Sequence, residues 1–278
     1  MRIHPRYTQR LAVTILGGAT LLTLAVLVFI IVFVLEKGLP VVNFRFLLTN
    51  AEDMGRSGGI FTTLIGTIVL PLLAIIVAAP LGISTAVYLT EYTLETKVTK
   101  IIRFGTDCLA GIPSIIFGLF GFIFFVTTLG LGWSILSGGL TLAFMILPTI
   151  IRTTEEAVKA VPKSYRQVSF SLGATRWQTV KRIILPNALP GILTGIMLGI
   201  GRSIGETAAV IFTAGSSLRL PTSIFDSTRT MAVHFYILAR EGLSSENAYG
   251  TAATLIIAVL AINLTAYWMM GRFIAKRS

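Results

Sequence analysis

Long apolar segments separated by short charged connections make up most of this 278-residue chain. Within these segments hydrophobic residues run continuously and do not alternate with polar ones, which favours membrane-spanning helices over the strands of a membrane barrel. About 20 apolar residues suffice for a helix to cross a hydrocarbon core of about 30 Å. The sequence therefore predicts an all-α, polytopic membrane protein that forms one domain over residues 1–278. The six predicted transmembrane helices are residues 11–35, 60–89, 104–129, 135–151, 189–214 and 249–271.

The composition agrees with a chain that lies largely in lipid. Hydrophobic residues make up 54% of the chain, charged residues only 13%, and the mean hydropathy is +0.83, whereas soluble domains carry about 25% charged residues. The net charge of +11 does not indicate nucleic-acid binding, because Lys and Arg occur in short blocks between apolar segments. Cys108 lies in an apolar stretch, and we expect it to be buried as a small hydrophobic side chain.

The distribution of Lys and Arg sets the predicted orientation. These residues are concentrated near both termini and in the connections 97–103 and 152–186, whereas the alternate connections 36–59 and 216–248 carry fewer. The two termini and the 152–186 loop are therefore predicted to be cytoplasmic, in a multi-pass protein of the inner (cell) membrane.

The sequence contains no P-loop, no GxGxxG motif and no Ser–His–Asp candidate. We therefore predict that the chain is not an enzyme and that it binds no metal or cofactor itself. His234 lies in an amphipathic segment, 227–242, which we predict to be a short helix near the outer surface. A lone histidine in such a segment is expected to be packed rather than to ligate a metal.

The predicted cytoplasmic loop contains signals for short helices. Ser164 with Gln167, and Thr175 with the glutamine three residues later, have the spacing of capping boxes, in which side chains satisfy free backbone N–H groups at a helix N-terminus. Gly173 lies where a residue in the left-handed conformation ends a helix. We predict two or three short helices, the last of which ends before Pro186.

One of these short helices has an apolar side that would face water, formed by Val168, Phe170 and Leu172. Two interpretations are open from the residues alone. The helix docks in a groove of a partner protein, or it lies on the lipid surface, held there by its basic residues.

The fifth predicted span carries charged residues inside the membrane. On a continuous helix Gly191, Gly195 and Gly199 share one face with Arg202 and Glu206. A lone charge at mid-span costs about 2.5–3.5 kcal/mol on insertion scales, so this face is predicted to look into protein or water. Two roles are open: an ion pair that only fixes packing, or an anion path that is lined by Arg202 and gated by Glu206. The planar guanidinium donors suit phosphate oxygens.

The loop resembles the cytoplasmic signature loop, or EAA loop, of ABC importer permeases. The resemblance is carried by Gly173, followed after nine residues by Ile183-x-Leu185-Pro186, while the family's Glu-Ala-Ala triplet aligns with the differing residues Gln167-Val168-Ser169. It implies a type I permease bundle whose coupling helix docks on an ATP-hydrolysing subunit. The residues implied in this coupling are Ser164, Gln167, Phe170, Leu172, Gly173, Ala174, Leu185 and Pro186.

Part of the fifth span, GRSIGETAAVIFTAG, also resembles the matching helix of phosphate-specific permeases of the Pst type. Other segments of the chain resemble segments of the PstA-like subunits of these permeases, namely GGIFTTLIGTIVL, PLGISTAVYLTEY, GIPSIIFGLFG and MAVHFYILAREG. The resemblance implies inward transport of inorganic phosphate that involves Arg202 and Glu206. It further implies a PstC-like homologous permease, two PstB-like ATPase subunits that bind ATP and Mg²⁺, and a PstS-like extracytoplasmic phosphate-binding protein. A permease for another oxyanion (molybdate or sulfate), a secondary transporter and a membrane scaffold remain as alternatives.

Overall fold

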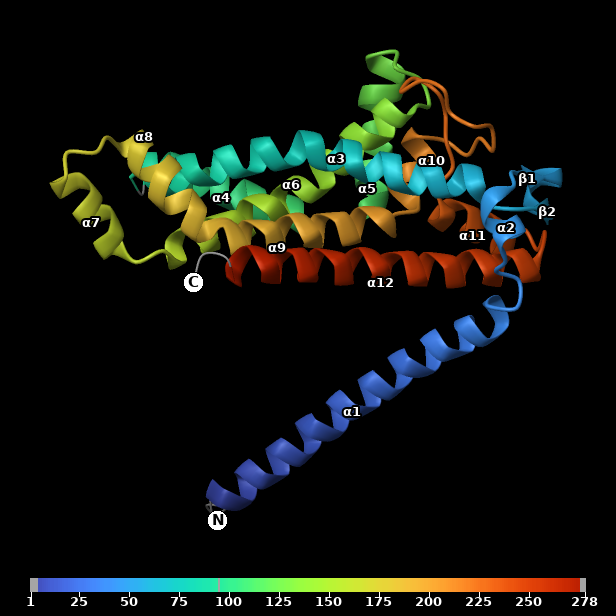
Figure 1. The fold of residues 1–278 in the computed structure, drawn as a ribbon, viewed down its shortest axis with the longest axis horizontal. Helices are drawn as coiled ribbons and strands as arrows, with labels where there is room; N and C mark the ends of the chain where they lie inside the picture. Colours follow the sequence, from blue (N-terminus) through green and yellow to red (C-terminus); the bar gives the residue numbers. More distant parts are fainter. Residues whose placement is uncertain (1–4, 95, 276–278) are drawn as a thin grey trace.

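Four long helices lie side by side and form the body of the protein (Figure 1). The computed structural model describes residues 5–94 and 96–275. The four helices are α3 (Phe61–Val87), α6 (Ile135–Ala160), α9 (Leu185–Ile204) and α12 (Ser245–Ala275). The all-α prediction is confirmed apart from a two-stranded hairpin. The terminal charges at Arg2, Lys276 and Arg277, used for the orientation, lie outside the described residues.

The remaining elements are short, apart from the first helix. The helices are α1 (Pro5–Gly38), α2 (Phe44–Leu48), α4 (Lys97–Ala110), α5 (Ser114–Gly121), α7 (Lys163–Ser171), α8 (Arg176–Thr179), α10 (Ala208–Thr213) and α11 (Met231–Arg240). The hairpin strands are β1 (Ala51–Glu52) and β2 (Ser57–Gly58), joined by the 3₁₀ turn η1 (Asp53–Gly55). Three π-helical segments are η2 (Tyr88–Tyr92), η3 (Phe122–Thr128) and η4 (Val180–Ile184).

Within the described residues, five helical stretches are long and apolar enough to cross a membrane. They are Gln9–Gly38, Phe61–Tyr92, Ile135–Ala160, Arg176–Ile204 and Ser245–Trp268. These stretches overlap the first, second, fourth, fifth and sixth predicted spans, but their ends differ, and the fifth ends at Ile204 rather than at Ala214. The continuous apolar segments thus located the spans correctly.

The third predicted span is bent. Helix α4 and the following α5–η3 segment meet at an angle of 101°, because Pro113 lacks an N–H group and disfavours the helical conformation at the residue before it. The prediction of one span over 104–129 holds only when this bent pair counts as a single span, and the predicted total of six spans is reached on the same condition. Cys108 is exposed, contrary to expectation, since α4 buries the opposite face, with Thr99 and Thr106.

Small residues let α3 and α6 approach closely. In lipid, where the hydrophobic effect does not drive helices together, the close packing of their side chains stabilises the contact. Gly82 of α3 faces Ile150 of α6, and a Cβ at this glycine would lie 2.8 Å from the isoleucine Cγ2. Gly139 of α6 in turn receives the side chain of Leu73. The largest cluster of buried apolar side chains lies along this contact.

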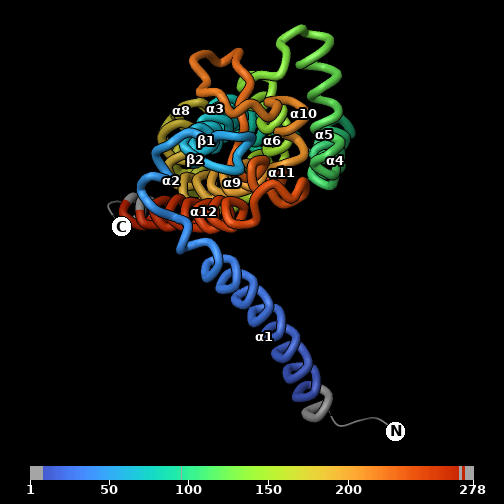
Figure 2. Tube along the Cα trace, turned by 90° about the vertical axis from the view of Figure 1, so that its right-hand side faces the viewer, coloured from blue at the N-terminus to red at the C-terminus, as the bar shows by residue number. Residues whose placement is uncertain are grey.

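Helix α1 diverges from the other long helices over most of its length (Figures 1 and 2). It packs on α12 near its C-terminal end, where Gly38 contacts Tyr249 and Ala253 and the Lys37 ammonium lies 4.5 Å from the centre of the Phe33 ring. The apolar residues of α1 from Leu11 onward are largely exposed in the isolated chain.

The two ends of the bundle are built differently (Figure 1). One end carries α7 and α8, and we call it the α7 end. The opposite end carries α2, the β1–β2 hairpin and α11, and we call it the hairpin end. Figure 2 shows the hairpin and α11 lying across the ends of the long helices.

A buried Arg–His contact holds the hairpin end together. Arg229 donates from Nε to the Ser216 carbonyl at 2.8 Å, and its Nη1 lies 3.3 Å from Nδ1 of His234. His234 is only 1% exposed and is covered by Gly55, where a Cβ would lie 2.6 Å from the ring Cε1. Burial, and secondly the charge of Arg229, lower the pKa of His234 from 6.5 to about 4. The neutral ring therefore accepts at Nδ1, and the prediction of a packed histidine on a short helix is confirmed.

Candidate functional site

The glycine face of α9 packs against α6 as its spacing predicts. A Cβ at Gly191 would lie 2.5 Å from the Ala157 Cβ, and a Cβ at Gly195 would collide with the Thr153 hydroxyl. Backbone-to-side-chain contacts this close are possible only without a side chain on α9. The glycines therefore fix how α9, and the charged residue at its end, are oriented in the bundle.

The fifth span does not continue as one helix to Ala214. Helix α9 ends at Ile204, and α10 begins at Ala208 after a break that contains Glu206. Glycine in a helix interior costs about 1 kcal/mol relative to alanine, and Gly205 lies where α9 ends. The prediction that Arg202 and Glu206 share one helical face was therefore wrong.

Arg202 and Glu206 are both half-buried. Among the described residues, the ion pairs do not include one between these two side chains. Their assignment to a transport pathway stays a prediction, but the idea that the pair merely fixes packing loses its geometric basis.

Arg202 lines a cavity of about 260 Å³ between α9 and α12. The cavity is bounded by Thr194, Met197, Leu198, Gly201, Arg202, Asn263, Ala266 and Tyr267. The amide of Asn263 and the phenol of Tyr267 can donate hydrogen bonds, so the cavity brings neutral donors next to a guanidinium. An anion is the ligand that such a donor set suits. The sequence did not indicate the two α12 residues, which lie in an ordinary apolar segment.

Helix α7 forms where the sequence predicts the first short helix of the loop, but it begins differently. Pro162 is its N-cap, without a side-chain hydrogen bond, and Lys163 is its first residue. Ser164 and Gln167 therefore lie inside the helix, and the predicted capping box between them was wrong. With Pro162 as the N-cap, the helix starts two residues before the position that a box with Ser164 as the N-cap requires.

The end of α7 agrees with the prediction. Gly173 has a φ of +78°, its N–H donates to the Phe170 carbonyl at 2.9 Å, and the Ala174 N–H donates to the Ser169 carbonyl at 3.1 Å. This pair of bonds is a Schellman motif, which needs a left-handed residue at the position of Gly173. The tight reversal leaves Leu172 at the tip of the loop, 83% exposed.

The second capping box is confirmed. Thr175 accepts from the Gln178 N–H at 3.3 Å, and the Gln178 side chain accepts from the Thr175 N–H at 2.9 Å. The following helix does not end before Pro186, however. It runs from α8 through η4 into α9, with Leu185 and Pro186 in the first turn of α9. The wider π-helical turn of η4 precedes the proline, whose missing N–H would interrupt a regular helix interior.

The 152–186 loop is therefore mostly helical and projects an apolar side. Helix α6 extends to Ala160, so the connection is shorter than the sequence indicated. On α7, Val168 and Phe170 are exposed, while Ser169 is buried and its hydroxyl lies 2.8 Å from the Thr179 hydroxyl. This is the exposure predicted for a helix that docks on something else.

A partly buried ion pair that the sequence did not indicate joins α7 to the bundle. The Arg166 guanidinium contacts both oxygens of the Glu91 carboxylate, with Nη2 at 2.6 Å from Oε1 and Nε at 3.2 Å from Oε2. The side chains are only 18% and 11% exposed. Arg166 also donates to the carbonyls of Val161 at 2.7 Å and Val158 at 2.9 Å. It thereby satisfies carbonyls at the C-terminal end of α6, where a cation is favourable.

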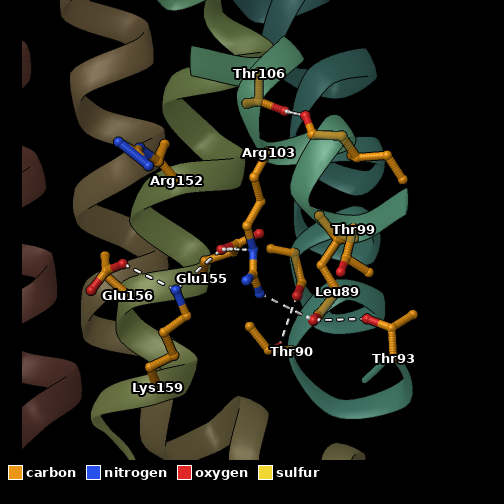
Figure 3. Close-up of polar contacts among 12 residues, drawn as sticks. Leu89, Thr90, Thr93, Thr99, Arg103, Thr106, Arg152, Glu155, Glu156 and Lys159 are labelled. Atoms are coloured by element: carbon orange, nitrogen blue, oxygen red, sulfur yellow. Dashed lines mark hydrogen bonds and ion pairs between the residues drawn. The ribbon is translucent and has the colours of Figure 1, made fainter. Parts of the chain in front are cut away.

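A buried carboxylate lies on the neighbouring part of α6 (Figure 3). Glu155, with a side chain only 4% exposed, lies 3.3 Å from Nε of Arg103 on α4 and 3.3 Å from Nζ of Lys159. Arg103 also donates to the Leu89 carbonyl in η2 at 3.4 Å. Of these contacts, the four-residue spacing of Glu155 and Lys159 was visible in the sequence, whereas the contact to α4 was not.

Comparisons with known proteins agree with this architecture. The family model described as "Binding-protein-dependent transport system inner membrane component" matches residues 78–278. The chain is 34% identical to the probable ABC transporter permease protein YqgI of Bacillus subtilis, with 99% of both chains covered. It is 36% identical to the phosphate transport system permease protein PstA 1 of Mycobacterium tuberculosis, covering 80% of this chain and 72% of that protein. It is also 34% identical to the probable permease YqgH of B. subtilis, covering 78% and 75%.

Solved structures of ABC importers share the fold. A bacterial alginate ABC transporter superposes with a TM-score of 0.69 at 16% identity and covers 96% of each chain. The MetNI methionine ABC transporter, in an inward-facing conformation, gives a TM-score of 0.62 at 19% identity and covers 77% of this chain and 94% of that one. With the family match over most of its length, the chain belongs to the family of inner membrane components of binding-protein-dependent transport systems, and it is a PstA-like member.

Proposed function

We propose that the chain is a permease subunit that carries inorganic phosphate inward and forms half of a translocation pathway. The observation that carries this proposal is Arg202, a guanidinium near the end of a membrane-spanning helix, which lines a cavity with hydrogen-bond donors. An uncompensated charge in a span is costly and marks a functional site. The similarity to PstA permeases, which act in phosphate transport systems, supports phosphate as the anion.

The proposed energy source lies in other subunits. Helix α7 would dock through Phe170 and Leu172 on an ATPase subunit, two of which would bind the ATP and Mg²⁺. A phosphate-binding protein outside the membrane would deliver the substrate. A homologous permease subunit would complete the pathway, and the match of this chain to two permeases of one organism, YqgI and YqgH, supports such a pair.

The proposed orientation places the α7 end in the cytoplasm and the hairpin end outside, with both termini cytoplasmic. The excess of Lys and Arg in the 97–103 and 152–186 connections supports this orientation. It also places α7 on the side where ATP is available, as the proposed docking requires.

The proposed mechanism assigns separate tasks to α7 and to Arg202. Movement of docked α7 would open the bundle alternately to either side of the membrane, and phosphate would bind near Arg202 during its transport. Neutral donors such as Asn263 and Tyr267 orient the oxyanion without adding charge. One guanidinium with neutral neighbours holds phosphate more weakly than a cluster of cations would, so the anion can leave again.

Reconstituted transport tests the proposal. The chain is co-expressed with its permease, ATPase and binding-protein partners, and the purified complex is placed in vesicles for uptake of radioactive phosphate. Wild-type uptake should require ATP and withstand an excess of sulfate or molybdate. Arg202→Gln should lower uptake at least about tenfold, equivalent to about 1.4 kcal/mol, with the complex intact.

Arg240→Gln supplies the matched control, because this arginine is exposed on α11, outside the spans. It should transport normally. Wild-type uptake by Arg202→Gln would refute the role of that residue. Uptake of molybdate or sulfate in place of phosphate would refute the substrate, and uptake driven by an ion gradient without ATP would identify a secondary transporter.

A further inference from the structure

Helix α7 is attached to the rest of the chain at few points. Of its residues, all of which the structure describes, Ser169 is the buried one, and it contacts α8 through the Thr179 hydroxyl. The other firm attachment is Arg166, which contacts Glu91 and two carbonyls of α6. A helix held in this way does not transmit force through a packed apolar interface.

A cavity of about 480 Å³ lies beside α7 and separates part of it from the bundle. Its lining residues are Thr90, Glu91, Lys159, Lys163, Arg166, Gln167 and Phe170. Because this space is open, the Arg166–Glu91 pair bridges the gap between α7 and the C-terminal ends of α3 and α6. A bidentate pair between a planar guanidinium and a carboxylate also fixes direction as well as distance.

The contacts continue from this pair toward the break in the fifth span. Segment η2, which carries Glu91, also accepts a hydrogen bond from Arg103 of α4. Helix α4 leads through the 101° bend into α5. Gly118 of α5 packs on α10, where a Cβ would lie 3.0 Å from the Cα of Ala209, and α10 directly follows the break at Glu206. Contiguity alone does not establish coupling, so the test must measure coupling itself.

We propose that Arg166 and Glu91 are positioning residues that transmit movement of α7 to α3 and α6 and so couple ATP hydrolysis to transport. The inference rests on the proposed function, since it requires an ATPase that docks on α7. The low exposure of both side chains protects the pair from screening by solvent and salt. The pair touches neither substrate nor nucleotide in this role.

The test uses Glu91→Gln, which keeps the size of the side chain and removes its charge, Arg166→Gln, and the double variant. Each is purified as the assembled complex. The measured quantity is the stimulation of ATP hydrolysis by phosphate-loaded binding protein, together with phosphate taken up per ATP. Both should fall about fivefold or more, within the range of known coupling energies, while the amount of co-purified ATPase stays constant. The double variant should be no worse than the single ones, because the residues act as one unit.

Two further variants separate the explanations. Glu156→Gln breaks the exposed ion pair between Lys159 and Glu156 at the same end, with side chains 46% and 71% exposed, and should change nothing because such pairs contribute little. Leu172→Glu should instead abolish co-purification of the ATPase, since it places a charge on the docking surface.

Three outcomes overturn the inference: unchanged stimulation in the Glu91 and Arg166 variants, effects that add in the double variant, or loss of the ATPase from their complexes, which indicates a structural role. Stimulated hydrolysis without phosphate uptake by the wild-type complex would refute the proposed substrate and leave the inference intact. A wild-type complex without any stimulated hydrolysis would refute both.

Discussion

Acidification should destabilise the protein through His234. The pKa of this buried histidine is lowered to about 4, from 6.5. The unfolded state therefore binds a proton more readily than the folded state, so stability is fully present above pH 6.5 and falls as the pH drops toward 4. Helix α11, which carries the residue, lies outside the stretches that can span the membrane, so bulk pH is the relevant variable.

The magnitude follows from the two pKa values. Between pH 8 and pH 5 the free energy of unfolding should fall by about 2 kcal/mol from this residue alone, and the loss should level off at about 3 kcal/mol below pH 4. The physical origin is the burial of the imidazolium next to Arg229, whose own charge repels it.

Unfolding of the detergent-solubilised protein by SDS, measured at several pH values, checks this prediction. His234→Asn is the matched variant, because an amide oxygen can replace Nδ1 as the acceptor for Arg229 without titrating. The variant should lose about 2 kcal/mol less than the wild type between pH 8 and pH 5. If both proteins lose the same amount, the ring is not buried in its neutral form and the account of the hairpin end is wrong.

Two glycines allow further tests by single substitutions. Gly173→Ala should cost about 1 kcal/mol through its positive φ and should weaken co-purification of the ATPase, although a Cβ there meets no atom within 4 Å. Gly195→Ala should destabilise the protein by about 1–3 kcal/mol, because the new methyl group overpacks the contact with Thr153, as SDS unfolding would measure. Gly105→Ala, which meets open space without a positive φ, should be neutral in both assays. Equal behaviour of the three variants would contradict both arguments.

The apolar segments that contain the membrane helices could be located because hydropathy depends on local sequence only. The positions at which the backbone bends or a helix is interrupted could not be predicted in this way. The bend at Pro113 and the break around Glu206 lie inside apolar segments, where hydropathy registers no change. Proline and glycine indicated that interruption was possible, but membrane bundles tolerate both within straight helices. Tertiary packing decides which of them interrupts the span.

In the candidate site too, local motifs could be predicted from the sequence, whereas contacts between distant segments could not. The reversal at Gly173 and the capping box at Thr175 are local motifs, and the structure confirms both. Glu91 and Arg166 are 75 positions apart, and no spacing rule connects them. The partners of Arg202 in its cavity come from α12, so they depend on how α9 and α12 pack.

The break in the fifth span bears directly on the proposed role of Arg202. On a continuous helix, Glu206 would pair with Arg202 and neutralise it, and an anion would have to displace the carboxylate. Because α9 ends at Ile204, Arg202 lies in its last turn, where the backbone carbonyls of a helix end together carry a partial charge of about −0.5. These carbonyls stabilise a guanidinium without cancelling its charge. In the proposed pathway, Arg202 would therefore attract phosphate and still release it.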